Sequence, residues 1–130
     1  MNKYGILGWP LERSYSPVIH TFLLKHASIE GKYELIKMNE INNKNIDQIN
    51  KSYSGYNVTI PYKEKILEVC EEAHLDVHVK KIGSVNTVKN KDGITSFYNT
   101  DYLGFLNFLE IINFNPEGRK IMILGSGGSS

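Results

Sequence analysis

The chain has 130 residues, enough for one ordinary domain that buries about two-thirds of its unfolded surface. Its 15 Lys and Arg residues nearly balance 14 Asp and Glu residues, and 41% of the residues are hydrophobic. This composition excludes a disordered chain and a polyanion-binding surface, so we expect no nucleic-acid partner. The single cysteine, Cys70, has no partner for an internal disulfide and fits a reducing compartment. No run of about 18 apolar residues occurs, so we expect a soluble, cytoplasmic protein outside the membrane.

A short strand and a helix are predicted at the start of the chain. Residues 4–8 form an apolar run that ends at a Gly-Trp-Pro sequence, which favours a buried strand. Residues 16–26 predict a helix, because Ser16 suits the N-cap and Pro17 the first helical position. The face of this helix that we expect to be buried comprises Ile19, Phe22 and Leu23.

Short apolar runs and helix-length amphipathic segments alternate along the rest of the sequence. The predicted elements are a strand at 32–38, a polar helix around 41–49, a strand at 55–61, a helix from Tyr62 or Lys63 to about Cys70, a short helix at 75–79, β-rich stretches at 84–88 and 94–97, a helix at 101–114 and a strand at 120–124. The turn-forming cluster at 90–93 predicts an antiparallel hairpin. This order predicts an α/β fold, a three-layer α/β/α sandwich whose mostly parallel sheet contains an antiparallel hairpin strand.

Residues 120–130 form the first half of a strand–turn–helix unit. The strand predicted at 120–124 leads into a glycine-rich turn, whereas phosphate binding by such a turn also depends on the N-terminus of a following helix. We therefore expect a truncated chain. Residues 1–114 would form one domain with its connecting helix, and residues 119–130 the first strand and turn of a Rossmann-type domain.

Two polar clusters lie near predicted element boundaries in the first half of the chain. Ser14 and Ser16 offer two hydroxyl groups at a helix start, although capping alone would account for Ser16. Asn57, Thr59 and Lys63 follow one predicted strand towards its end. Because ligands bind at strand ends in open α/β sheets, this second cluster favours contact with a polyol.

The second half of the chain contains further polar positions with competing interpretations. Asn86 interrupts a β-rich run and is either a solvated strand-edge residue or a ligand contact. Thr100 or Asp101 suits the N-cap of the long helix, which is the simpler explanation for both. His74 and His78 have helical i, i+4 spacing, but the sequence favours a solvated helix face over a metal site.

Taken together and in this order, the motifs resemble those of the shikimate dehydrogenase family. The segments that carry the resemblance are Ser14-Tyr15-Ser16-Pro17, Asn57-Val58-Thr59-Ile60-Pro61-Tyr62-Lys63, Gly83-Ser84-Val85-Asn86-Thr87, Asn99-Thr100-Asp101-Tyr102-Leu103-Gly104-Phe105 and Gly125-x-Gly127-Gly128. The resemblance covers the whole chain, and five ordered motifs make it specific. Two positions depart from the family pattern, since Arg13 stands where His is usual and Thr21 where Asn often follows the motif histidine.

The resemblance implies reversible NADPH-dependent reduction of 3-dehydroshikimate to shikimate, in the chorismate pathway towards aromatic amino acids. It implies that Lys63 and Asp101 form the catalytic pair. The substrate-binding residues it implies, beside that pair, are Ser14, Ser16, Asn57, Thr59, Asn86 and Thr100. The cofactor-binding residues it implies are Gly125, Gly127, Gly128 and Ser129, with NADP as cofactor and no metal.

Two alternatives to this function stay open at the level of sequence. A quinate or aminoshikimate dehydrogenase would use the same residues, and a shikimate-binding module without activity would keep the fold. Retention of both Lys63 and Asp101 favours an enzyme, because a mere binding module has no need of the pair. The sequence also leaves a homodimer open.

Overall fold

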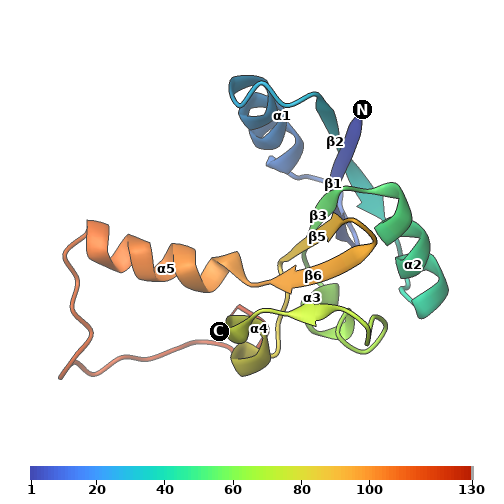
Figure 1. The fold of residues 1–130 in the computed structure, drawn as a ribbon. Helices are drawn as coiled ribbons and strands as arrows, with labels where there is room; N and C mark the ends of the chain where they lie inside the picture. Colours follow the sequence, from blue (N-terminus) through green and yellow to red (C-terminus); the bar gives the residue numbers. More distant parts are fainter. Residues whose placement is uncertain (130) are drawn as a thin grey trace.

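A computed structural model describes residues 1–129, and its six strands form one sheet in the order β2-β1-β3-β5-β6-β4 (Figure 1). The strands are β1 (Asn2–Gly8), β2 (Gly31–Lys37), β3 (Gly55–Val58), β4 (His74–Leu75), β5 (Thr87–Lys91) and β6 (Ile94–Tyr98). Strand β1 pairs in parallel with β2 and β3, and β4 pairs in parallel with β6. The pairs β3–β5 and β5–β6 are antiparallel. The predicted α/β fold, with an antiparallel hairpin strand in a mostly parallel sheet, is confirmed.

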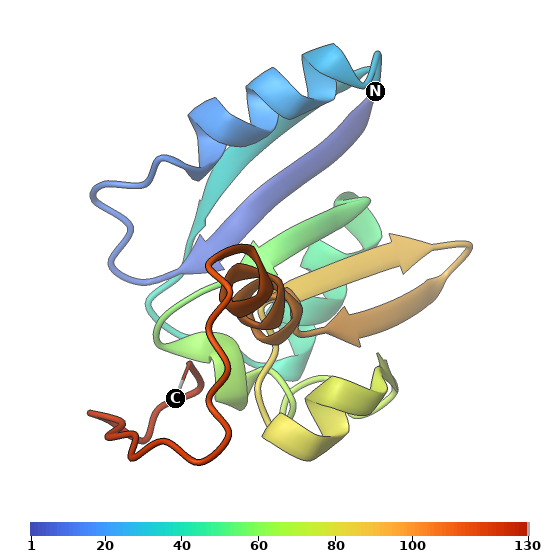
Figure 2. The same cartoon turned by 90° about the vertical axis from the view of Figure 1, so that its left-hand side faces the viewer.

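Five helices lie around this sheet. They are α1 (Ser16–His26), α2 (Asn43–Ser52), α3 (Tyr62–Lys65), α4 (Val77–Ile82) and α5 (Thr100–Ile111). Figure 2 shows α5 end on in front of the sheet and α2 behind it, with α1 along the β1–β2 side. Helix α5 then extends away from the sheet (Figure 1).

The hydrophobic core lies between the sheet and α2, α3 and α4. In the register of the parallel strands, Leu7 is paired with Ile36 and Val58, so these three side chains share one face. Val88 and Phe97 continue this face across the hairpin. All five are buried and pack against apolar side chains from the helices and loops, namely Ile41, Ile46, Ile49, Tyr62, Ile66, Val79 and Val85. The opposite face carries Tyr4 and Ile6 of β1 together with the polar groups of Tyr33, Asn57 and Thr87.

The hairpin of β5 and β6 turns through Asp92 and Gly93. Both residues have positive φ, 53° and 76°, which is the conformation that a two-residue Asp-Gly turn provides most readily. The register pairs Lys91 with Ile94 directly across this turn. The predicted hairpin is therefore confirmed, but its first strand begins at Thr87 and not at residue 84. Residues 84–86 precede the strand and are buried.

Helix α1 has the predicted range, but the prediction of its buried face is wrong. Ile19, Phe22 and Leu23 are 54%, 59% and 51% exposed. The half-buried positions one step round the helix are instead Ser16, His20 and Leu24, spaced four residues apart. Ser16 is the first helical residue and not the cap, and its backbone N–H donates to the Ser14 hydroxyl at 3.2 Å.

Four further predicted elements differ from the structure. Helix α3 ends at Lys65, earlier than the apolar face up to Cys70 suggested, and residues beyond it continue in turns. Leu75 lies in β4, so the short helix begins two residues later, at Val77. Helix α5 ends at Ile111 and not at residue 114, and none of its residues is buried. Residues 120–124 form no strand among residues 1–129, so the strand predicted there stays a prediction for the whole protein.

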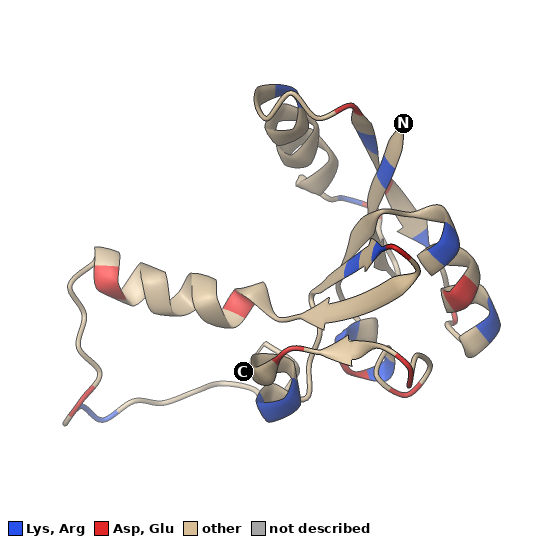
Figure 3. Cartoon of the chain, viewed as in Figure 1, with Lys and Arg blue, Asp and Glu red and all other residues tan. Residues whose placement is uncertain are grey.

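Charged residues of both signs are interspersed along the described part of the chain (Figure 3). This distribution agrees with the near-zero net charge of +1.

Among residues 1–129, no helix is both long and apolar enough to cross a bilayer.

Candidate functional site

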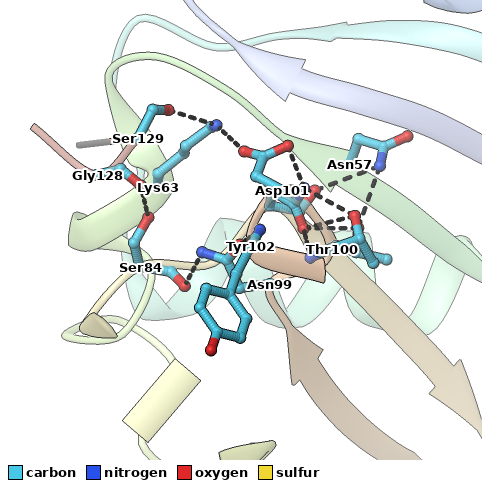
Figure 4. Close-up of polar contacts among 11 residues, drawn as sticks. Asn57, Lys63, Ser84, Asn99, Thr100, Asp101, Tyr102, Gly128 and Ser129 are labelled. Atoms are coloured by element: carbon cyan, nitrogen blue, oxygen red, sulfur yellow. Dashed lines mark hydrogen bonds and ion pairs between the residues drawn. The ribbon is translucent and has the colours of Figure 1, made fainter. Parts of the chain in front are cut away.

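Polar side chains gather where β3 and β5 meet the first residues of α3 and α5. Lys63 is the second residue of α3, which follows the turn after β3. Thr100 and Asp101 are the first two residues of α5, which follows β6. Asn86 directly precedes β5. Figure 4 shows that the side chains of Lys63 and Asp101, far apart in sequence, point towards one another, with Thr100 beside Asp101.

Lys63 and Asp101 form a close ion pair. The Lys63 ammonium donates to Asp101 Oδ2 at 2.6 Å, and the side chains are 20% and 51% exposed. The lysine stem is therefore largely enclosed, whereas the carboxylate remains open to solvent. An ammonium held beside an accessible carboxylate can donate a proton to a ligand and orient its hydroxyl groups.

The buried Asn86 connects this pair to the start of α5. Its Nδ2 donates to Asp101 Oδ1 and to Thr100 Oγ1, each at 2.8 Å. Its Oδ1 accepts the Thr100 backbone N–H at 2.8 Å and the Thr87 hydroxyl at 2.9 Å. Asn86 thus holds one carboxylate oxygen of Asp101 while Lys63 holds the other, so the solvated strand-edge interpretation of Asn86 is wrong.

The N-cap of α5 is Asn99, so neither Thr100 nor Asp101 caps the helix as predicted. Asn99 Oδ1 accepts the Tyr102 backbone N–H at 3.1 Å. Its Nδ2 donates to the Ser84 carbonyl at 3.0 Å, in a buried contact. Because Asn99 satisfies the helix end, the carboxylate of Asp101 is free to act elsewhere.

Asn57 lies on β3 beside this network. Its Nδ2 is 3.3 Å from both the Asn86 carbonyl and Thr87 Oγ1, and its Oδ1 accepts the Tyr33 hydroxyl at 2.7 Å. Tyr33 and Thr87 were not predicted from the sequence. The available signal was the alternation of side chains along a strand, which puts the polar groups of Tyr33 on β2 and Thr87 on β5 on the face opposite the core.

The structure places the other predicted substrate-binding residues around this network without joining them to it by hydrogen bonds among residues 1–129. Thr59 lies in the turn between β3 and α3, and its methyl group fills the space where a Cβ at Gly8 would be, 2.5 Å away. Ser14 and Ser16 are half-buried at the start of α1. Arg13 and Thr21, the two departures from the family pattern, are exposed.

The glycine-rich segment lies against the same site. Ser84 Oγ donates to the Gly128 carbonyl at 2.8 Å, and the Lys63 ammonium donates to Ser129 Oγ at 3.0 Å. A Cβ at Gly128 would come within 2.5 Å of Ser84 Oγ, so a larger residue there would displace the Ser84 hydroxyl. A groove of about 560 Å³ runs between this segment and the turn after β3, lined by Thr59, Ile60, Pro61, Lys63, Glu64, Lys65, Glu68, Gly127, Gly128 and Ser129.

A dinucleotide needs more than this segment provides. A pyrophosphate binds where a strand, a glycine-rich turn and the N-terminus of a helix meet. Gly125, Gly127, Gly128 and Ser129 form neither the strand before such a turn nor the helix after it within residues 1–129. The described residues alone therefore do not fit NADP.

The described residues also show no metal centre. Among residues 1–129, no group of three or more His, Cys, Asp or Glu side chains is close enough to hold an ion. His74 lies in β4 and His78 in α4, so the helix face that we expected them to share does not form. The ring of His78 packs against Tyr102, with centroids 4.7 Å apart.

The fold and the site define an α/β domain with a lysine–aspartate pair at the ends of its central strands β3 and β5. Amide and hydroxyl groups surround this pair. The family model described as the shikimate dehydrogenase substrate binding domain matches residues 6–88. The chain belongs to the shikimate dehydrogenase family.

Relatives and solved structures agree with this assignment. The chain is 40% identical over 135 residues to the shikimate dehydrogenase (NADP(+)) of Clostridium perfringens, and 38% identical over 134 residues to that of Caldicellulosiruptor bescii. These matches span 100% of the chain but only 48% and 46% of the two relatives. The chain therefore spans about half the length of the curated relatives it matches.

Two solved structures superpose closely on the chain. Shikimate dehydrogenase 1 from Peptoclostridium difficile has a TM-score of 0.89 and 33% identity, over 99% of this chain and 48% of that one. Shikimate 5-dehydrogenase from Thermus thermophilus in complex with shikimate has a TM-score of 0.87 and 32% identity, over 99% and 49%.

Proposed function

We propose that the chain is the substrate-binding half of an NADP-dependent shikimate dehydrogenase, which reduces 3-dehydroshikimate reversibly to shikimate. The observation that carries the proposal is the network in which Lys63 and Asn86 each hold one oxygen of Asp101. Family membership and the relatives named shikimate dehydrogenase (NADP(+)) support the same reaction. The proposed place of the reaction is aromatic amino acid biosynthesis through chorismate. The proposed location is the cytoplasm, which fits the free thiol of Cys70.

In this proposal, Lys63 is the general acid. Reduction of a ketone creates a developing alkoxide, which the Lys63 ammonium stabilises and to which it transfers a proton from Nζ. When bound in the whole protein, NADPH supplies the hydride. In the reverse direction, neutral Lys63 accepts the hydroxyl proton of shikimate.

Asp101 orients Lys63 through the 2.6 Å contact and accepts a hydrogen bond from a ring hydroxyl. The more open of the two side chains is Asp101, and this exposure is what a substrate contact requires. The proposed partners of the carboxylate and ring hydroxyls of shikimate are Ser14, Ser16, Asn57, Thr59, Asn86 and Thr100.

The experiment that tests the proposed function compares substrates on the whole protein. Purified protein containing both halves should reduce NADP with shikimate, with a kcat/KM at least about tenfold above that for quinate. A higher kcat/KM for quinate would favour the quinate dehydrogenase alternative. Binding of shikimate without any NADP reduction would identify a binding module instead.

A further inference from the structure

Tyr33 reaches across one strand to the side chain of Asn57. Tyr33 lies on β2 opposite Tyr4 of β1, and Asn57 lies on β3 opposite Ile6 of β1. Because Tyr4 and Ile6 are two residues apart, all four side chains share the sheet face opposite the core. The Tyr33 hydroxyl lies 2.7 Å from Asn57 Oδ1, although 24 residues separate the two in sequence.

The neighbours of Asn57 decide which way its carboxamide faces. The backbone carbonyl of Asn86 lies 3.3 Å from one end of the amide and accepts hydrogen bonds only. The NH₂ group must therefore face Asn86 and Thr87, which leaves Oδ1 facing Tyr33. It follows that the Tyr33 hydroxyl is the donor in this contact.

The Tyr33 ring is itself held in place. The imidazole of His20 from α1 stacks on it, with ring centroids 4.3 Å apart and planes inclined by 2°. Burial raises the pKa of the Tyr33 phenol far above its usual range, and the nearby Ser16 hydroxyl opposes part of this rise. The phenol therefore remains protonated, and remains a donor, around neutral pH.

We propose that Tyr33 is a positioning residue of the substrate site, which, together with the Asn86 carbonyl, keeps the NH₂ group of Asn57 turned towards Asn86 and Thr87. Tyr33 acts through Asn57 and does not itself touch the reacting atoms. The polar chain from Tyr33 continues through Asn57, Thr87 and Asn86 to Asp101. A rotated Asn57 amide would turn its oxygen towards the Asn86 carbonyl, which only accepts, and would break this chain. The inference rests on the proposed function, since it takes Asn57 as a substrate contact.

A matched pair of variants in the whole protein tests the proposal. Tyr33→Phe removes the donor to Asn57, whereas Tyr56→Phe removes a similar tyrosine contact, 2.8 Å to Asn50 Oδ1, on the core face of the sheet. Tyr33→Phe should raise the KM for shikimate about tenfold, the effect of one hydrogen bond, with kcat within about twofold of the parent. Tyr56→Phe should leave KM unchanged. Equal KM values for the two variants would overturn the proposal.

A second readout does not depend on activity. The side-chain amide signal of Asn57, identified by its loss in Asn57→Ser, should move in the ¹H–¹⁵N spectrum of Tyr33→Phe and move less in Tyr56→Phe. An unmoved signal in Tyr33→Phe would show that Tyr33 does not set the amide and would overturn the inference. If the parent lacks shikimate-dependent activity while the signal moves, the proposed function fails and the positioning of Asn57 by Tyr33 stands.

Discussion

The ammonium of Lys63 lies 2.6 Å from the carboxylate of Asp101, although 38 residues separate the two in sequence. Lys63 is the second residue of α3, which follows β3, and Asp101 is the second residue of α5, which follows β6. Between them, β5 runs antiparallel to β3 and β6 antiparallel to β5, so β6 runs in the same direction as β3. The hairpin therefore brings the start of α5 to the start of α3 and assembles the pair.

Substitution of Asp101 separates a structural role from a chemical one. Asp101→Asn removes the negative charge beside Lys63 but leaves the cap of α5 intact, because Asn99 provides it. In the whole protein we expect a parental melting temperature and a kcat lower by about 10- to 100-fold, the effect of a hydrogen bond to a charged group.

The matched control for that substitution is Asn99→Ala. It should lower the free energy of unfolding by about 1 kcal/mol or more, because both the helix cap and the buried contact to Ser84 are lost. Thermal melts and steady-state kinetics of the two variants check this. Full activity in Asp101→Asn would remove the carboxylate from the proposed chemistry.

The two serines at the start of α1 should affect binding more than turnover. Ser14→Ala and Ser16→Ala each remove one hydroxyl group, so the KM for shikimate should rise about 3- to 10-fold while kcat stays near the parental value. Ser14 Oγ also accepts the Ser16 backbone N–H, so Ser14→Ala should in addition lower the melting temperature slightly. A fall in kcat without a change in KM would contradict a binding role for both.

Sequence patterns predicted the local elements better than the faces they bury. The range of α1 followed from its N-terminal Ser-Pro, yet its inward side carries Ser16, His20 and Leu24 instead of the more apolar residues. The reason is tertiary, since His20 stacks on Tyr33 of the neighbouring strand. Hydrophobic periodicity carries no information about such a partner.

The candidate site could be predicted in outline because its residues follow strand ends. The cap of α5 could not, because Asn99, Thr100 and Asp101 are all residues that cap helices. The choice among them is made by the buried contact of Asn99 to Ser84, fifteen residues away. Tyr33 was missed for a similar reason, since its partner Asn57 lies two strands away.

The stability of the protein should depend on His20 as the pH falls. Burial lowers the pKa of His20, so below about pH 6.5 the unfolded chain binds this proton more readily than the folded protein does. The free energy of unfolding should therefore fall between about pH 7 and pH 5. His20→Gln should reduce that fall, as measured by urea denaturation at a series of pH values. An identical pH dependence in the variant and the parent would contradict this role of His20.

The 130 residues on their own should lack turnover. The proposed substrate contacts, from Ser14 to Asp101, lie within these residues, but the described residues do not complete a site for NADP, which is needed to position the reacting groups. We expect calorimetry to detect weak shikimate binding by the isolated chain and spectrophotometry to detect no NADP reduction. Turnover by the purified 130-residue chain would contradict this expectation.

The most direct test of Lys63 as the general acid is the kcat of Lys63→Met measured beside Lys51→Met in the whole protein. Both substitutions remove the ammonium of a 2.6 Å ion pair, Lys63 with Asp101 in the site and Lys51 with Asp47 on the surface of α2. If Lys63 is the general acid, Lys63→Met should lower kcat by about 10²- to 10⁴-fold with KM for shikimate changed far less, while Lys51→Met retains parental kinetics. Equal kcat values for the two variants, in proteins that melt alike, would contradict the assignment of the catalytic pair.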